Sequence, residues 1–587
     1  MTPETQAGTR TRMVERGGAE LFVSERGDPA NATVVLVHGY PDTHAVWDEL
    51  VGELCEHLHT AAYDVRGMGR SIAPSTSDAF LLPELALDVH AVIDAVSPDR
   101  PVHLVGHDWG AFQCWEAIAS ESAPERIASF TAIAGPKLDA AAPWVLRRLR
   151  RSPSGLKEIL GQARRSWYVA AFQIPGLPER ALGYGMERTW PRLMRRLEGI
   201  EPRAGHPAAT ITRDARAGLA LYRTNLRPPA RRGAPAQAQV PVQVIVPTRD
   251  RYISTAFYDD AQDWSARVWR REIHSGHWAQ RSHPHAVARA VSELVEHVEG
   301  GPEPAPLRRA RFTGRRRDLE GRLAVVTGAG SGIGRATALA LAAAGAEVIA
   351  ADINLASARA TAERSDLVHA VQVDVGDVGA MEEFAAGVER EYGVPQIVVN
   401  NAGIGIGGPF LDTTLGDWER IVDINLWGVI HGCRLFGRQM VEAGVEGQIL
   451  NTASMAAYTP SRLLPAYSTT KAAVLMLSEC LRAELAGTGI GVTAICPGFI
   501  DTNITRTTHI VGVSPEEERR RQEQAARAYG RRGYTPDRVA AAILRAIRRN
   551  PAVLPVAPEA YVARTISRVS PSLLRGLGRL ELDRSGR

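Results

Sequence analysis

Residues 106–110 read Gly-His-Asp-Trp-Gly and follow the apolar run Val102 to Val105, so that Asp108 stands between two glycines. A turn of the form Gly-x-nucleophile-x-Gly joins a strand to a helix and exposes its central side chain above a sheet. Serine esterases carry serine there, whereas a carboxylate can form an ester with an alkyl carbon. The alternative reading of the motif alone is a helix-capping aspartate between turn glycines.

An acid and a histidine follow Asp108 in chain order. Asp250 comes after the apolar run Val242 to Val246, and His277 stands in a Ser-Gly-His-Trp turn. Taken singly, His277 would be a structural histidine and Asp250 a solvated loop acid. Taken together, they give the order nucleophile, acid, histidine, which is that of α/β-hydrolases. We therefore expect these three residues to be catalytic.

Strand-like apolar runs alternate with helix-like segments in the first half of the chain, which predicts a mostly parallel sheet covered on both faces. The runs are Thr33 to Val37, Val102 to Val105, Phe130 to Ile133 and Val242 to Val246. Tyr40 follows the first run, and its N–H is predicted to form an oxyanion hole with that of Trp109. Between about Lys137 and Gln239 the alternation stops, which predicts a helical lid over the carboxyl edge of the sheet.

With these motifs, residues 10 to 298 resemble the epoxide hydrolases of the α/β-hydrolase superfamily. The turn from Asp64 to Ser71 and the lid support the resemblance. In that family two lid tyrosines donate hydrogen bonds to the epoxide oxygen, and Tyr168 and Tyr222 match their positions. The resemblance implies that Asp108 attacks an epoxide carbon and that His277, oriented by Asp250, hydrolyses the resulting ester to give a vicinal diol. Alone, either tyrosine would be read as lid packing.

A haloalkane-type dehalogenase is the competing interpretation, because it shares the Asp-acid-His set. Trp109 is compatible with halide binding. Haloalkane dehalogenases, however, commonly have asparagine at the position of Tyr40, fluoroacetate dehalogenases have arginine at the position of Trp109, and neither needs the tyrosine pair. We therefore favour a lipophilic epoxide as the substrate.

The length of 587 residues predicts at least two domains. We place the first at 1–299, a turn-rich and arginine-rich linker at 300–317, a second domain at 318–559 and a basic tail at 560–587. A net charge of only +4 gives no reason to expect a nucleic-acid partner. The N-terminus has no apolar leader segment and no apolar stretch is long enough to span a bilayer, so we expect a cytoplasmic protein. The five cysteines have no metal-type spacing, and we expect no metal.

The second half begins with a strand-turn-helix signature. Residues 327–334 read Thr-Gly-Ala-Gly-Ser-Gly-Ile-Gly, after the apolar run Leu323 to Val326 and before a helix-like segment. Glycines there let the backbone approach a pyrophosphate at a helix N-terminus. A second strand ends in Asp352, at the spacing where a carboxylate meets the adenosine ribose hydroxyls. Because Ser331 is not basic, NAD is favoured over NADP.

Tyr467 and Lys471 lie one helical turn apart, on one face of the expected helix. A lysine and an oxidised nicotinamide are both positive, so they are expected to lower the pKa of the phenol and make it a usable proton acceptor. The spacing alone occurs by chance in structural helices. Lys471 is, however, one of three lysines among 69 basic residues.

Residues 318 to about 550 resemble the short-chain dehydrogenase/reductase family, a Rossmann-type doubly wound parallel sheet. The resemblance implies that Tyr467 is the general acid/base, Ser454 orients the substrate oxygen, Lys471 binds the nicotinamide ribose and Asn425 supports a proton-relay water. It also implies hydride transfer between NAD and an alcohol or ketone, and self-association of the chain. The implied cofactor-binding residues are Gly328, Ser331, Gly332, Ile333, Gly334, Asp352, Asp374, Val375, Asn401, Ala402, Gly403, Tyr467, Lys471, Pro497, Gly498 and Thr502.

The tail mixes apolar residues with arginines in an amphipathic pattern that Pro571 interrupts. It is predicted either to lie on an anionic membrane surface, as a peripheral contact, or to cover a subunit or domain interface. Hydrolase-then-dehydrogenase order resembles actinobacterial fusion proteins. For the whole chain we favour a bifunctional enzyme that opens an epoxide and oxidises the diol. Two uncoupled activities, or a scaffold with one idle site, are the alternatives.

Overall fold

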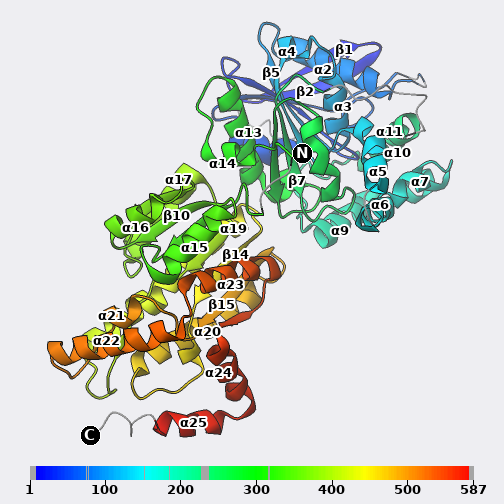
Figure 1. Cartoon of the computed structure of the whole chain (residues 1–587). Helices are drawn as coiled ribbons and strands as arrows, with labels where there is room; N and C mark the ends of the chain where they lie inside the picture. The colour runs from blue at the N-terminus through cyan, green and yellow to red at the C-terminus, as the bar shows by residue number, and fades with distance from the viewer. Residues whose placement is uncertain are drawn as a thin grey trace. The chain divides into compact units, whose positions relative to one another are not determined.

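The computed structural model describes residues 8–74, 76, 78–150, 153–183, 185–226, 237–314 and 318–580. The chain divides into two compact units, Met1–Arg315 and Arg316–Arg587, each with its own sheet (Figure 1). Part of the expected lid (227–236), the end of the expected linker (315–317) and the last seven residues of the tail lie outside the described residues. None of the helices in the described ranges combines the length and apolar character needed to cross a bilayer.

Eight strands form the sheet of the first unit, in the order β1-β2-β4-β3-β5-β6-β7-β8. β2 is antiparallel to both of its neighbours, and all other neighbouring pairs are parallel. The strands are β1 (Arg10–Arg16), β2 (Ala19–Arg26), β3 (Thr33–Val37), β4 (His59–Tyr63), β5 (Val102–His107), β6 (Ile127–Ile133), β7 (Val242–Pro247) and β8 (Val268–Ile273). The mostly parallel α/β sheet predicted from the four apolar runs is confirmed, since each run is a strand.

Successive side chains of a strand point to opposite faces, so both faces of this sheet carry a core. Val35 and Val37 face the helices α2 (Leu82–Val96) and α3 (Trp109–Ala117), whereas Val34 and Leu36 face α1 (Asp48–Leu54) and α13 (Pro284–Val298). The remaining short helices outside the lid are η1 (His44–Trp47), α4 (Ala123–Arg126), η4 (Thr255–Asp263) and α12 (Ala279–Ser282).

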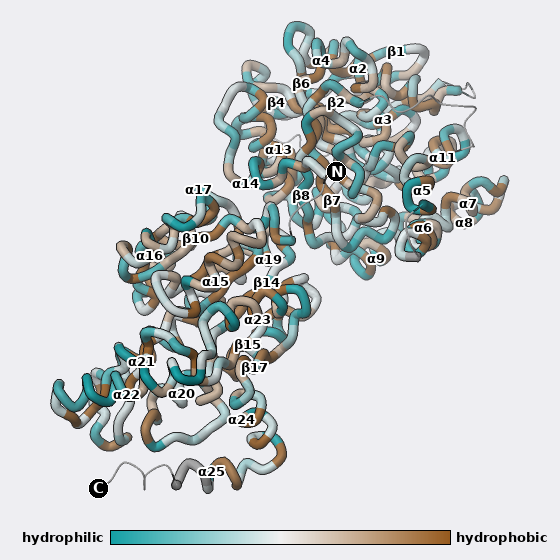
Figure 2. Tube along the Cα trace, viewed as in Figure 1, coloured by the Kyte–Doolittle hydropathy of each residue, from teal (hydrophilic) through white to brown (hydrophobic). Residues whose placement is uncertain are grey.

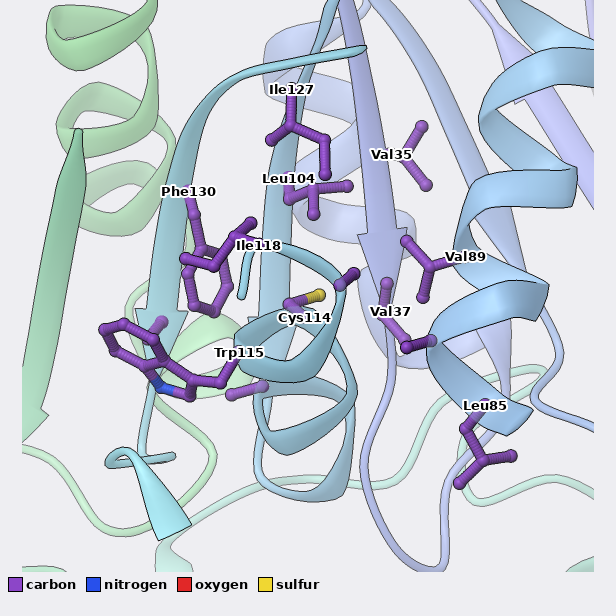
Figure 3. Packing of buried hydrophobic residues seen from close by; sticks show 14 of the residues in the cluster. Val35, Val37, Leu85, Val89, Leu104, Cys114, Trp115, Ile118, Ile127 and Phe130 are labelled. Carbon is purple, nitrogen blue, oxygen red and sulfur yellow. The ribbon is translucent and has the colours of Figure 1, made fainter. Parts of the chain in front are cut away.

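Trp115 fixes α3 against the sheet, as the packing in Figure 3 shows. Its ring meets the Phe130 ring edge-on, with centroids 5.1 Å apart. Its indole N–H donates to the Gly135 carbonyl over 3.0 Å. Because α3 begins at the carboxyl end of β5, this packing also fixes the position of the residue that joins them, Asp108.

The chain leaves the sheet between β6 and β7 and forms a series of helices there. They are η2 (Leu138–Ala140), α5 (Ala141–Arg150), α6 (Pro153–Arg165), α7 (Trp167–Phe172), α8 (Leu177–Leu182), α9 (Met186–Leu193), the π-helical turn η3 (Met194–Glu198), α10 (Ile211–Ala217) and α11 (Leu219–Asn225). Buried Arg148 ties α5 to the body of the unit, because its guanidinium bonds Asp260 at 2.7 Å and the Ala256 carbonyl at 3.0 Å. We call this segment the lid.

Part of the segment expected to be a turn-rich linker, 300–317, is folded onto the first unit. Residues Ala305–Ala310 form a helix, α14, and Leu307 and Phe312 are buried against the first unit. The Phe312 N–H also donates to the Val268 carbonyl of β8. The prolines before this segment suggested a spacer, but Pro at the first turn of a helix is well tolerated, and the buried side chains supply the packing.

Seven parallel strands form the main sheet of the second unit, in the order β11-β10-β9-β12-β14-β15-β17. They are β9 (Leu323–Thr327), β10 (Glu347–Asp352), β11 (Val368–Gln372), β12 (Ile397–Asn400), β14 (Gly447–Thr452), β15 (Ile490–Pro497) and β17 (Val553–Val556). A small second sheet pairs β13 (Ile406–Gly407) with β16 (His509–Ile510). The strand order reverses between β9 and β12, which is the point where doubly wound sheets bind ligands.

Helices cover both faces of this sheet. Leu323 and Val325 face the helices α17 (Val378–Tyr392), α19 (Gly428–Glu442) and α20 (Pro465–Glu484), whereas Ala324 and Val326 face α15 (Gly332–Ala343) and α23 (Pro536–Arg549). The other helical segments are α16 (Leu355–Ala362), α18 (Leu415–Val422), η5 (Asp423–Trp427), η6 (Met455–Ala457), α21 (Ile504–Thr507), α22 (Pro515–Arg532), α24 (Pro558–Val569) and α25 (Pro571–Leu580). The predicted Rossmann-type doubly wound fold is confirmed.

The expected tail begins as a packed helix. Ala560 and Ala563 of α24 are buried, and the helix ends just before Pro571, where the amphipathic pattern is interrupted. Val562 and Val569 are exposed, and Figure 2 shows apolar and polar residues mixed along α24. Contact of this segment with a membrane stays a prediction.

Candidate active sites

Asp108 stands at the turn between β5 and α3 with a φ of 50° and a ψ of −118°. This conformation is uncommon for a residue with a side chain and is characteristic of strained functional turns. The glycines around it leave no room for other side chains. A Cβ on Gly110 would lie 2.0 Å from the Val37 carbonyl oxygen, and one on Gly39 would lie 2.5 Å from the Asp108 Cβ. The chain therefore forms the sharp turn that its glycine spacing predicts.

The Asp108 carboxylate is nearly buried and meets two of the expected partners. Its Oδ1 accepts a hydrogen bond from the Tyr40 backbone N–H over 3.0 Å. Its Oδ2 lies 3.4 Å from His277 Nε2. The Tyr40 N–H therefore contacts the carboxylate directly, and an oxyanion hole formed by the N–H groups of Tyr40 and Trp109 stays a prediction.

His277 is held by Asp250, as the order of the residues predicted. Its Nδ1 lies 2.8 Å from Asp250 Oδ2. The other carboxylate oxygen of Asp250 accepts the backbone N–H groups of Tyr252 and Ile253, at 2.7 and 3.1 Å. These bonds fix the carboxylate, which in turn fixes the orientation of the imidazole, with Nε2 toward Asp108.

Two carboxylates set the charge of His277. Burial lowers the pKa of this imidazole, but the charges of and hydrogen bonds to Asp250 and Asp108 outweigh burial and raise its pKa well above the usual value. The neighbouring His107 behaves in the opposite way: burial, reinforced by the charge of His277, lowers its pKa to about 4. One histidine of this pair therefore carries charge in the resting site and the other is neutral.

The two expected lid tyrosines lie together beside Asp108. Tyr168 comes from α7 and Tyr222 from α11, and their ring centroids are 5.9 Å apart. Tyr222 also meets the Trp109 and Tyr40 rings edge-on, at 4.9 and 5.3 Å. Burial, followed by nearby charges that include Asp108, raises the pKa of both lid tyrosines. Both phenols therefore stay protonated and can donate hydrogen bonds.

In the second unit, the glycine turn joins β9 to α15. Gly328 and Gly332 have φ values of +65° and +53°, which glycine adopts without strain. A Cβ on Gly328 would lie 2.8 Å from the Ala402 Cα, and one on Gly334 would lie 2.1 Å from the Gly328 carbonyl oxygen. The backbone is thus bare where a pyrophosphate would approach the N-terminus of α15.

Asp352 lies at the carboxyl end of β10, beside this turn. Its carboxylate accepts the Gly330 N–H over 2.8 Å and the Asn354 N–H over 2.9 Å. Asn401 closes the other side, since its side-chain amide donates to the Thr327 carbonyl over 3.1 Å. The donor and acceptor groups of this cradle fit a nicotinamide dinucleotide.

The four expected catalytic residues of the second unit converge near the carboxyl ends of β12 and β14. The Tyr467 hydroxyl is hydrogen-bonded to Ser454. Lys471 Nζ donates to the Thr452 carbonyl over 2.7 Å and lies 5.8 Å from the centre of the Tyr467 ring. Asn425 is fully buried in the π-helical turn η5, where its amide bonds both the N–H and the carbonyl of Ile404.

The pKa of Tyr467 differs from our expectation. In the chain alone, burial raises the pKa of this phenol, and the hydrogen bond to Ser454 opposes the increase. Burial also lowers the pKa of Lys471, to about 8. The positive charges of the lysine and of a bound nicotinamide predict a lowered pKa for Tyr467, whereas the cost of burying the phenolate depends on the fold and has no signal in the sequence.

The remaining expected cofactor residues lie around the same edge. Ser331 is at the N-cap position of α15 without a side-chain capping bond, and a Cβ on Gly332 would lie 3.4 Å from Thr502. Asp374 accepts the Gly376 N–H over 2.9 Å. Gly403 lies between Asn425 and Lys471, and a Cβ there would lie 3.1 Å and 3.4 Å from their polar atoms. Ile333 and Gly334 are in the first turn of α15, Val375 follows Asp374, and Pro497 and Gly498 are at the end of β15.

Comparison with known proteins assigns each of the two units to a protein family. Residues 34–290 match the alpha/beta hydrolase family, and residues 322–510 match the short chain dehydrogenase family. The probable oxidoreductase EphD of Mycobacterium tuberculosis is 42% identical over 595 residues, which cover 99% of this chain and 100% of that protein. The chain belongs to the EphD family. It is a fusion of an α/β-hydrolase and a short-chain dehydrogenase/reductase, which supports an enzyme with a nicotinamide cofactor.

Other relatives match the second domain of the fusion alone. The sorbitol dehydrogenase of Cereibacter sphaeroides is 36% identical over 235 residues, which cover 38% of this chain and 90% of that protein. Among solved structures, a short-chain dehydrogenase from Burkholderia phymatum in complex with NAD is 29% identical and covers 41% of this chain and 92% of that chain, with a TM-score of 0.38.

Several residues of the two sites of the fusion were missed by the sequence analysis. The Tyr252 ring packs on His277 with centroids 4.9 Å apart, and Glu198 of the lid accepts the His277 backbone N–H over 2.8 Å. In the dehydrogenase domain, Thr327 Oγ1 accepts the N–H groups of Asn401 and Ala402, at 3.0 and 3.1 Å. Tyr252 could have been suspected from its position two residues after Asp250. Glu198 had no signal, because its contact joins segments far apart in the sequence.

The charge of Asp108 should be visible in the titration of His277. Replacing Asp108 with alanine removes one of the two carboxylates that raise the pKa of His277, so the pKa should fall. Imidazole proton resonances followed by NMR against pH measure this change. Asp94→Ala, at an exposed carboxylate paired with Arg126, is the control and should leave the pKa unchanged. An unchanged pKa in Asp108→Ala would show that the two groups are not coupled.

Proposed function

We propose that the first domain is an epoxide hydrolase. The observation that carries this proposal is the pairing of a carboxylate nucleophile, Asp108, with two protonated lid phenols, Tyr168 and Tyr222. A carboxylate that opens an epoxide leaves an alkoxide, which needs a hydrogen-bond donor or a proton. Protonated hydroxyls of the lid close to the nucleophile are suited to that need.

The first step would form an ester. One Asp108 oxygen attacks an epoxide carbon, the carbon–oxygen bond of the ring breaks, and its electron pair goes to the epoxide oxygen. Tyr168 or Tyr222 donates to that oxygen and supplies a proton. Because Asp108 becomes an uncharged ester, His277 loses one of the charges that raise its pKa. Its proton can then pass to the tyrosinate, which leaves a neutral imidazole that can accept a proton once the ester has formed.

The second step would release the diol. His277 takes a proton from water as the oxygen attacks the Asp108 carboxyl carbon, and the Tyr40 N–H donates to the oxyanion that forms. Collapse of this intermediate restores the Asp108 carboxylate and frees the alkyl oxygen, which accepts a proton. The second proton of the water goes to the alkyl oxygen, and His277 keeps the first, so the site regains its charged His277, its ionised Asp108 and its protonated tyrosines.

A dehalogenase would use the same nucleophile, acid and histidine. A departing halide is already a stable anion and needs no proton, so the tyrosine pair would have no task in that reaction. The Tyr40 ring also packs against Tyr222, and its hydroxyl donates a hydrogen bond to the Ala215 carbonyl over 2.8 Å. These observations favour the epoxide over the halide.

The two-step mechanism makes a prediction for His277. His277→Gln should still form the ester but hydrolyse it slowly, with turnover lowered roughly a hundredfold to ten-thousandfold. Intact-mass spectra after incubation with a lipophilic epoxide should then show the enzyme plus one substrate. Asp108→Ala is the matched control and should form no adduct. Failure of His277→Gln to accumulate any adduct would argue against an ester on the route.

We infer that the second domain uses NAD to interconvert an alcohol and a ketone. When bound, NAD accepts or returns the hydride of the carbinol carbon. Tyr467 would exchange the hydroxyl proton with the substrate oxygen, and Ser454, hydrogen-bonded to that phenol, would hold the oxygen in line. Buried Lys471 is placed between Tyr467 and Gly403, where the nicotinamide ribose would lie. Asn425 would anchor a relay water beside Lys471.

The preference for NAD should depend on the charge of Asp352. Asp352→Asn keeps an oxygen for the Gly330 N–H but removes the charge that would repel a 2′-phosphate. The ratio of kcat/KM with NAD to that with NADP should therefore fall about tenfold or more, or about 1.4 kcal/mol. Asp366→Asn, at an exposed carboxylate just before β11, is the control. A ratio unchanged in Asp352→Asn would mean that another group selects the cofactor.

The diol made by the first domain carries the alcohol that the second domain would oxidise. A fusion raises the local concentration of such an intermediate at the second site. We therefore propose a two-step enzyme that converts a lipophilic epoxide, with a fatty epoxide as the first candidate, to a hydroxyketone. Two uncoupled activities are the second candidate.

A coupled assay separates these two candidates. The purified chain is incubated with a long-chain fatty epoxide and NAD, and NADH formation and diol are both recorded. NADH should appear with the wild-type chain, whereas neither diol nor NADH should appear with Asp108→Ala. Tyr467→Phe should accumulate diol without NADH. Diol without NADH in the wild-type chain would show that the two domains serve different substrates.

A further inference from the structure

A cavity of about 650 Å³ lies beside the loops of the hydrolase domain that carry Asp250 and His277. Arg249 and Arg251, which flank Asp250, are in its wall, and so are Ser275 and Gly276, which precede His277. The catalytic side chains Asp108, Asp250 and His277 do not line it. The cavity therefore shares two loops with the active site but is a separate space.

The wall is strongly basic. Its charged and titratable residues are Arg195, Arg196, Arg249, Arg251, Arg281, His274 and His283 against Glu49, Glu198 and Glu201. Two of the three glutamates are paired within the wall, Glu201 with Arg195 and Glu49 with Arg281. Exposed Arg196 and Arg251 thus outnumber the one remaining carboxylate, Glu198.

Two buried donors in the wall lack partners among the described residues. The Ser275 hydroxyl and the Arg281 Nε make no hydrogen bond there, although their residues are only 3% and 7% exposed. Buried polar groups are nearly always paired in folded proteins. These two donors lie beneath the surface of the cavity, so the groups that a ligand can reach are the exposed guanidinium groups of Arg196 and Arg251.

Glu198 connects the cavity to catalysis. It stands at the end of the lid turn η3, and its Oε2 accepts the His277 backbone N–H over 2.8 Å. Its other oxygen, Oε1, is buried without a hydrogen-bond partner among the described residues. A Cβ on Gly276 would lie 1.8 Å from the Glu198 carboxylate, so only glycine admits this contact. Whatever fills the cavity therefore lies against the loop that carries the catalytic base.

We propose that this cavity is a binding site for a phosphate group, separate from both active sites. Arginines converge on it from the lid, from the loop after β7 and from α12, and a tetrahedral phosphate accepts hydrogen bonds from several directions, whereas a carboxylate favours one arginine fork. The volume exceeds that of phosphate alone and suits a phosphorylated small molecule. A phosphate bound there holds the Asp250 and His277 loops together.

Calorimetric titration of the full chain at constant ionic strength tests the site, with inorganic phosphate and with dihexanoyl phosphatidic acid as probes. We expect saturable binding that Arg196→Ala and Arg251→Ala each weaken about tenfold or more. Glu198→Gln removes a like charge and should tighten binding about tenfold. Arg164→Ala, on α6 outside the cavity, is the control. Binding of free phosphate identifies a soluble source, and binding of the lipid probe alone identifies a lipid headgroup.

The same titration followed by NMR shows whether a ligand in the cavity affects His277. Phosphate should shift the ring resonances of His277 in the wild-type chain but not in Arg251→Ala, with His277→Gln used to assign them. Neither measurement requires an epoxide, so this proposal can fail while the proposed hydrolase function stands. Absence of saturable binding with both probes, or binding that both arginine variants leave unchanged, overturns the proposal.

Discussion

The hydrolase domain depends on one charge arrangement, a buried imidazole between two carboxylates. Asp250 fixes the ring from one side, and Asp108 faces it from the other. Burial alone would keep His277 neutral, and the carboxylates alone would keep it protonated. Because only Asp108 loses its charge during an ester mechanism, the same geometry can hold a charged histidine before the ester forms and a neutral imidazole, able to accept a proton, afterwards. The strained turn at Asp108, the packing of Trp115 and the bonds to Asp250 all maintain this geometry.

In the dehydrogenase domain, burial sets the charges of the catalytic side chains. Tyr467 and Lys471 are both withdrawn from water, which raises the pKa of the phenol and lowers that of the ammonium group. Both shifts favour the uncharged forms. A positive nicotinamide bound beside the Tyr467 phenol would lower its pKa and so favour the phenolate.

Local patterns predicted the parts of the fold that depend on neighbouring residues. Continuous apolar runs predicted the strands correctly because parallel strands are buried on both faces. The glycine turns were predictable because a side chain at these positions would collide with the neighbouring backbone. Residues 305–312 were misread for the opposite reason: Pro and Arg indicated a spacer, but Leu307 and Phe312 find a buried surface on β8 and α13 that no local pattern shows. Glu198 and Thr327 were missed likewise, since their partners are 79 and about 75 residues away.

The contact between Glu198 and the His277 loop also limits which lids from related proteins this domain can accept. Gly276 has no side chain because a lid carboxylate occupies the space beside it. A lid transplanted from a relative would bring its own residue to that point, and the loop would have to match it. The lid and the His277 loop therefore have to be exchanged together in a chimaeric protein, although 79 residues of chain separate Glu198 from His277.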